Sequence, residues 1–200
     1  MNVRLSTSFR FNAGVYYDNK MRINEYNLKV WMTTNSTNPA NHNIAFERMK
    51  YFIYNTLDST IFIDGSLEEQ CQAYIDAGLD ITTLPGSPVD QLIGIMLYYK
   101  LNAIMEDRMI VVETEFSSSM GDSMVYLHSE HETTTGVEPA PWWSSPDPVH
   151  CDSNLIESDK VVAIHQTSAW RELDMAWPDE ETETGNTVVF ANFKKTDDTE

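Results

Sequence analysis

The sequence predicts an α+β fold, in which two or three helices cover one face of an antiparallel sheet, followed by an acidic C-terminal extension. Segments of period two lie at both ends of the first 131 residues, and segments of helical period lie between them. The composition changes after that point, so we predict two regions, 1–131 and 132–200. At 42% hydrophobic and 11% aromatic residues, the chain of 200 residues can bury a core.

The first two elements are predicted strands. Residues 3–12 alternate partly between apolar and polar, and residues 21–34 alternate more clearly. Within the second strand Ile23 is out of step with the apolar positions from Tyr26 onward, which predicts a bulge there. A loop rich in Asn, Thr and Pro then follows over residues 35–43.

Two helices are predicted next. Residues 44–57 carry apolar side chains three or four apart, which is one helical face. Residues 66–77 begin with Ser66 and carry Glu69 three positions later, the pattern of a capping box. Gly78 is placed to end this second helix.

The third predicted helix spans residues 87–106, with Ser87 as N-cap and Pro88 at the first helical position. Its side chains are almost wholly apolar, so we expect it to be buried on nearly every side. Two strands follow at 108–116 and 122–128, predicted as a hairpin.

Residues 132–200 hold five of the eight prolines and most of the late acidic residues. The apolar runs at 161–164 and 187–190 are predicted as short strands.

Four of the five tryptophans lie in this C-terminal region. The adjacent Trp142 and Trp143 are predicted as a partner-binding element if exposed, and the alternative is burial against the core. Trp170 and Trp177 are seven residues apart, so they would share one helical face, for which packing is the favoured role.

The formal net charge is −18, from 13 basic and 31 acidic residues. This argues against direct nucleic-acid binding and against binding to anionic membranes, which both need positive charge. The charge is +3 over residues 1–60, −10 over 61–131 and −11 over 132–200, which favours head-to-tail self-association. Two cysteines and the absence of a membrane-length apolar run indicate a reduced, cytoplasmic setting.

The possible metal ligands cluster late in the chain. His128, His131, His150 and Cys151 offer a tetrahedral zinc set, but their spacing matches no known signature, and exposed or packed histidines are the favoured interpretation. No nucleophile elbow and no phosphate-binding glycine loop is present. We therefore predict no catalytic residue, no metal and no cofactor.

Four segments, taken together and in order, carry a resemblance. They are Phe11–Val15, Arg22–Tyr26, Pro88–Leu92, and Val112–Thr114 with Tyr126. Over residues 5–127 the chain resembles the tunnelling fold of the 6-pyruvoyl- and 6-carboxy-tetrahydropterin synthases. The resemblance implies two strands, helices and two further strands, and a homo-oligomer.

The chain departs from that family at its reactive positions. The three zinc histidines fall on Val15, Arg22 and Asn24, and the catalytic cysteine falls near Asp18. The family's Asp-His pair becomes Asp58-Ser59, which lacks the imidazole proton carrier. The metal and proton-transfer residues are thus missing, and we lean to a protein that is not an enzyme.

The resemblance also covers one part of the family's ligand site. It implies that Glu113, with Thr114, holds the amino-pyrimidine edge of a pterin or purine at a subunit interface, and that Asp90 and Gln91 complete the ligand-binding set. A carboxylate suits an edge that presents two adjacent N–H groups. Period two places Glu113 on the same strand face as Val111.

Three functions follow as hypotheses. The first is a non-catalytic oligomeric scaffold or accessory protein that acts through protein–protein assembly and through the C-terminal region. A viral origin, with the protein located in the virion, would suit this role. The second is an enzyme of pterin or deazapurine metabolism with a rearranged active site. The third is an acidic decoy that inhibits a nucleic-acid-binding protein.

Overall fold

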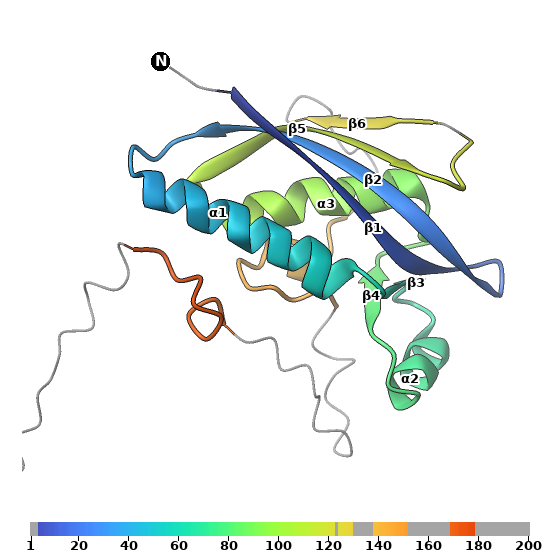
Figure 1. Ribbon diagram of the computed structural model, residues 1–200. Coiled ribbons are helices and arrows are strands. Elements are labelled where there is room, and N and C mark those ends of the chain that lie inside the picture. The colour runs from blue at the N-terminus through green and yellow to red at the C-terminus, as the bar shows by residue number, and fades with distance from the viewer. Residues whose placement is uncertain (1–3, 123, 130–137, 152–168, 179–200) are drawn as a thin grey trace, which may run out of the picture.

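The computed structural model describes residues 4–122, 124–129, 138–151 and 169–178. Six strands form one sheet in the order β4-β3-β1-β2-β5-β6, and α1 and α3 lie along one of its faces (Figure 1). The pairs β1–β3 and β3–β4 are parallel and the other pairs are antiparallel. The predicted α+β class, with helices on one face of the sheet, is confirmed. The elements in chain order are β1 (Arg4–Tyr17), β2 (Lys20–Thr34), α1 (Pro39–Tyr51), the π-helical turn η1 (Phe52–Leu57), β3 (Ile61–Asp64), α2 (Glu68–Asp76), β4 (Ile81–Leu84), α3 (Asp90–Met105), β5 (Met109–Ser118), β6 (Tyr126–Ser129) and the 3₁₀ turn η2 (Pro141–Ser144).

The β1–β2 hairpin is the longest pairing in the sheet, running from Arg4 opposite Thr33 to Tyr17 opposite Lys20. Asp18 and Asn19 join the strands with φ angles of 52° and 55°. Asp and Asn tolerate this left-handed conformation, which a two-residue hairpin turn requires. Alternate side chains face the helices and are buried, whereas the opposite face of the sheet, called the outer face below, carries polar side chains.

Strands β3 and β4 are the largest omission from the predicted order. Each has only four residues, Ile61–Asp64 and Ile81–Leu84, and nearly all are buried without alternation. A buried parallel strand shows no period of two, so such short runs carry no pattern to recognise. They extend the sheet beyond β1, with Gly14 paired to Ile61.

The predicted starts of the first two helices are wrong. Helix α1 begins at Pro39, where Asn38 is the N-cap and its Oδ1 accepts from the Ala40 N–H at 3.0 Å. Helix α2 begins without a capping box, because the Ser66 hydroxyl donates to Asp64 Oδ1 at 2.7 Å instead. In both places a local polar contact, not the apolar period, decides the boundary.

Helix α3 starts two residues later than predicted. Its N-cap is Val89, not Ser87, and its first helical residue is Asp90. The predicted burial is confirmed, since ten of its residues are buried, including the charged Lys100. This helix packs on β5 and on the other helical elements around it.

The bulge lies in β5, not at Ile23 of β2. Glu113 pairs with Trp31, but the neighbouring Met32 pairs with Val111, so Val112 is the extra residue. The burial pattern of β5 changes phase at this point, from Met109 and Val111 to Thr114 and Phe116.

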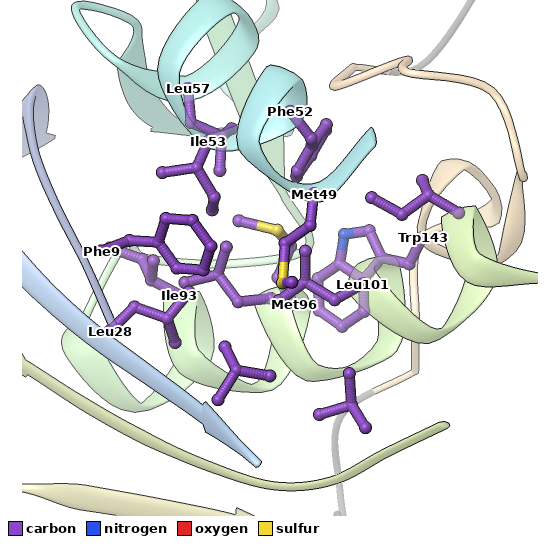
Figure 2. Close-up of a cluster of buried hydrophobic side chains, with 14 of the residues drawn as sticks. Phe9, Leu28, Met49, Phe52, Ile53, Leu57, Ile93, Met96, Leu101 and Trp143 are labelled. Atoms are coloured by element: carbon purple, nitrogen blue, oxygen red, sulfur yellow. The ribbon is translucent and has the colours of Figure 1, made fainter. Parts of the chain in front are cut away.

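The core lies between the sheet and the helices (Figure 2). Phe9 and Leu28 reach it from the sheet, Met49 from α1 and Met96 from α3. Trp143 enters the same cluster from the C-terminal region. The described parts of region 132–200 therefore share the core of the first region rather than forming a separate one.

The strands predicted at 161–164 and 187–190 lie outside the described residues. Within the described ranges, no helix has the length and apolar character needed to cross a membrane.

Candidate functional site

The four predicted ligand residues do not converge. Glu113 lies on the outer face of β5, where Arg4 of β1 donates to its Oε2 at 2.8 Å. The Glu113 side chain is 35% exposed. The bulge at Val112 puts Glu113 on the face opposite Val111, so the predicted shared face is wrong. The outer-face environment is an exposed ion pair, not a buried carboxylate.

Thr114 points the other way, into the protein. It is fully buried, and its Oγ1 has no hydrogen-bond partner among the described residues. Opposite it on β6 lies His128, also buried, which packs against Gly94 of α3. A Cβ at Gly94 would lie 2.5 Å from His128 Nε2, so this contact requires glycine. Glu113 and Thr114 therefore cannot hold one ligand from the same face.

Asp90 lies at the start of α3 in a polar cluster that ties this helix to the end of β5. Ser118 donates to Asp90 Oδ2 at 2.6 Å. Asn24 Oδ1 accepts from the Ser119 hydroxyl at 2.8 Å and from the Met120 N–H at 3.2 Å. Sequence reasoning missed this cluster, although three consecutive serines at the end of a strand were a signal that hydroxyl contacts would form there. The neighbouring Gln91 is exposed.

The three positions that the resemblance matched to zinc histidines lie near one another in the β1–β2 hairpin. Val15 pairs directly with Arg22, and Asn24 lies two residues further along the same face of β2. Valine has no donor atom, an arginine does not deprotonate, and the carbonyl oxygen of Asn24 is already engaged by Ser119. Burial, partly opposed by the Asn24 side chain, raises the pKa of the adjacent Tyr26 hydroxyl.

Asp58 and Ser59 hold β1 to the turn that follows η1. The N–H of Asn12 donates to Asp58 Oδ1 at 2.8 Å, and the Ser59 N–H donates to the Asn12 carbonyl at 2.7 Å. Ser59 has a φ of 71°, so the backbone turns sharply here. These contacts are structural.

The other possible metal ligands are only partly within the described chain. His128, His150 and Cys151 are described, whereas His131 lies outside. Within the part that the structure describes, no group of three or more His, Cys, Asp or Glu side chains is arranged to hold a metal ion.

Trp142 and Trp143 are core residues, which corrects the docking role predicted for them. Trp142 is 4% exposed and its indole N–H donates to the Thr83 carbonyl at 3.2 Å. Trp143 is fully buried and stacks on Tyr99 with ring centroids 6.3 Å apart. The burial alternative is the one that the structure shows.

Lys100 holds the loop that carries these tryptophans. Its Nζ donates to the carbonyls of Trp142, Ser145 and Asp147 at 3.0, 2.8 and 2.7 Å. Burial lowers the pKa of Lys100 to about 7, and the Asp147 carboxylate partly opposes this shift. Sequence reasoning missed this role, although a single lysine in an otherwise apolar helix was a signal for it.

Exposed apolar side chains lie near the β1–β2 turn, in the β5–β6 loop and on β6. We call this set the apolar rim. Ile23 is 76% exposed, and Leu127 on β6 is 51% exposed. The β5–β6 loop is held beside β2 by the bonds from Ser119 and Met120 to Asn24. The members of the rim are Met21, Ile23, Met120, Met124, Val125 and Leu127.

Comparison with known proteins gives similarity of structure only. No family model and no curated protein matches the chain. An uncharacterized protein from Wolinella succinogenes is 13% identical with a TM-score of 0.47, over 65% of this chain and 99% of its own. The 6-pyruvoyl tetrahydropterin synthases of Plasmodium vivax and Plasmodium falciparum are 12% and 14% identical, each with a TM-score of 0.42 over 64% of this chain and 97% and 96% of theirs. These synthases are of the family that the four sequence segments resemble.

Proposed function

We propose that this chain is a non-catalytic subunit that self-assembles through its apolar rim. The observation that carries the proposal is the set of exposed apolar side chains, Ile23 and Leu127 foremost, near the β1–β2 turn, in the β5–β6 loop and on β6. Exposed apolar patches of this kind mark protein–protein contacts, because each side chain leaves water on association. The occupant we assign to the rim is a second copy of this chain.

The residue types near the rim support a subunit without catalysis. Val15, Arg22 and Asn24 offer no zinc ligand set, and Asp58 is bonded to the backbone of β1 rather than to a histidine. The cluster of Asn24, Asp90 and the β5 serines instead fixes the β5–β6 loop, which carries half of the rim. Such bonds keep the apolar side chains of the loop in place.

Lysine substitution in the rim is expected to separate the subunits. In an Ile23→Lys/Leu127→Lys variant each copy would bring two charges into the contact, and burying an unpaired charge costs several kcal/mol. We expect the wild-type chain to elute as an oligomer in size-exclusion chromatography with light scattering. The variant should elute at the monomer mass of 22.9 kDa.

The matched control is Leu79→Lys, because Leu79 is 45% exposed but lies in the turn after α2, outside the rim. It should leave the oligomer mass unchanged. A wild-type chain of monomer mass at the concentrations tested would contradict the proposal, as would equal dissociation of the control.

Ligand binding at Glu113 is a second proposal, which we keep from the resemblance to the pterin synthases. A guanine, pterin or deazapurine compound held by this carboxylate should raise the melting temperature of the protein. Glu113→Gln should abolish the rise, because an amide has one acceptor oxygen where the carboxylate has two. Glu115→Gln, two residues along the same outer face, is the control. Equal shifts in both variants, or no shift with any compound, would reject the site.

A further inference from the structure

Residues 169–178 form a compact turn that closes on itself. The Met175 N–H donates to the Trp170 carbonyl at 2.8 Å, and the Glu172 N–H donates to the Ala169 carbonyl at 2.8 Å. Asp174 has a φ of 61°, the left-handed conformation that Asp tolerates. The predicted common helical face of Trp170 and Trp177 is therefore absent, because the segment forms a turn instead of a helix. The turn lies beside α1 (Figure 1), and both indoles belong to the buried core cluster.

The two indoles enclose the guanidinium of Arg48, which projects from α1. The Cζ of Arg48 lies 3.9 Å from the ring centroid of Trp177 and 5.0 Å from that of Trp170. Arg108 adds a second guanidinium, 4.6 Å from the Trp177 ring. Cation–π contacts between buried partners are among the stronger ones, and Trp is the best ring for them. Trp177 is fully buried and Trp170 is 5% exposed.

Both indole N–H groups and one backbone carbonyl of the turn also form hydrogen bonds with the rest of the protein. Arg48 Nε donates to the Met175 carbonyl at 2.9 Å. Trp177 donates to Glu106 Oε1 at 2.9 Å, and Trp170 donates to the Pro146 carbonyl at 2.6 Å. Proteins bind short peptides through features of this kind, namely buried aromatic side chains and hydrogen bonds to the peptide backbone.

The acceptor surface is ordered by bonds of its own. Arg48 forms an ion pair with Glu106 and donates to the Ile104 carbonyl at 3.3 Å, and Arg108 lies 3.8 Å from the second Glu106 oxygen.

We propose that the surface formed by Arg48, Glu106 and Arg108 is a peptide-docking site, and that its occupant can be segment 169–178 of a second copy of this chain. The cation–π contacts and hydrogen bonds that hold the segment come from two of its side chains and one carbonyl. Residues 152–168 join it to the body and span up to roughly 55 Å when extended, enough to reach a neighbouring molecule. Exchange of an identical element between protomers is a known route to association.

This site is separate from the apolar rim. The rim lies at the β1–β2 turn, whereas Arg48 and Glu106 lie at α1 and at the end of α3. Docking in trans uses none of the rim residues, and in a chain whose own segment is intact that tethered segment competes with it. The Ile23→Lys/Leu127→Lys variant should therefore keep its peptide-docking site, and failure of one proposal leaves the other standing.

The test uses the full chain with both anchors removed, Trp170→Ala/Trp177→Ala, and a fluorescent peptide with the sequence of residues 169–178. The variant should bind the peptide about tenfold or more tightly than the wild type, because the tethered wild-type segment competes at high effective concentration. A peptide carrying the same two alanines should not bind. Fluorescence anisotropy gives both affinities.

A complementation experiment tests exchange itself. The Trp170→Ala/Trp177→Ala chain keeps the acceptor surface, and an Arg48→Met chain keeps the segment, so mixing them should give a heterodimer that neither chain forms alone. Both chains also carry Ile23→Lys/Leu127→Lys, which removes association through the rim.

If the double alanine chain is unfolded, Trp177→Phe replaces it, since phenylalanine keeps a ring but cannot donate to Glu106. Folded variants that bind no peptide, or bind the alanine peptide equally well, would overturn the proposal, as would a mixture without heterodimer.

Discussion

Replacing Arg48 with methionine is expected to lower the free energy of unfolding by about 3–5 kcal/mol. The guanidinium is 2% exposed and forms an ion pair with Glu106, whose side chain is 29% exposed. Methionine would fill most of the space but would leave the carboxylate without its main partner. It would also remove the cation between the rings of Trp170 and Trp177.

Urea unfolding followed by tryptophan fluorescence measures this loss, and the Trp177 environment should change as well. A double-mutant cycle with Glu106→Gln isolates the ion pair, since removing both charges should cost less than the sum of the single changes. The control is Lys50→Met, which removes an exposed pair with Glu47 and should cost less than about 0.5 kcal/mol. If Arg48→Met were as mild as this control, the turn at 169–178 would not be held by Arg48.

Raising the pH from 7 to 10 is expected to stabilise the wild-type chain relative to a Lys100→Met variant. Burial lowers the pKa of Lys100 from 10.5 to about 7 in the folded protein, whereas the unfolded chain keeps the ordinary value. Between these two values the unfolded chain therefore binds more protons than the folded one. The free energy of unfolding then rises with pH, by more than about 1 kcal/mol per unit at the steepest.

The comparison with Lys100→Met cancels the titration of all other groups, which matters in a chain of net charge −18. Below pH 7 both states hold the proton, so the difference between the two proteins should become flat. The free energy of unfolding of Lys50→Met, plotted against pH, should run parallel to that of the wild type, because Lys50 is exposed. If the plot for Lys100→Met were also parallel to the wild type, the folded protein would keep the Lys100 amine charged up to the ordinary lysine range. The three carbonyl acceptors would then outweigh the effect of burial.

Much of the fold could be predicted from the sequence because its long elements carry a clear period. The alternation of β1 and β2 and the apolar length of α3 were sufficient to place these elements on a common core. The four-residue strands β3 and β4 could not be found in the same way, since they are too short and too uniformly buried to show a period. They depend on pairing with β1, which is a non-local contact.

The candidate sites were less predictable, and Glu113 shows why. One extra residue, Val112, turns the following side chains to the opposite faces of the sheet. Glu113 then meets Arg4 outside, and Thr114 lies inside. A bulge depends on how two strands pair, so a period counted along one strand cannot reveal it.

The sequence by itself determined the class of the fold and the burial of α3, because both follow from residue type and local spacing. Only the tertiary structure decided which polar groups meet. It brought Arg48 between Trp170 and Trp177, and Lys100 beneath the loop of Trp142. Buried cations need partners, and those partners come from parts of the chain that no local pattern connects.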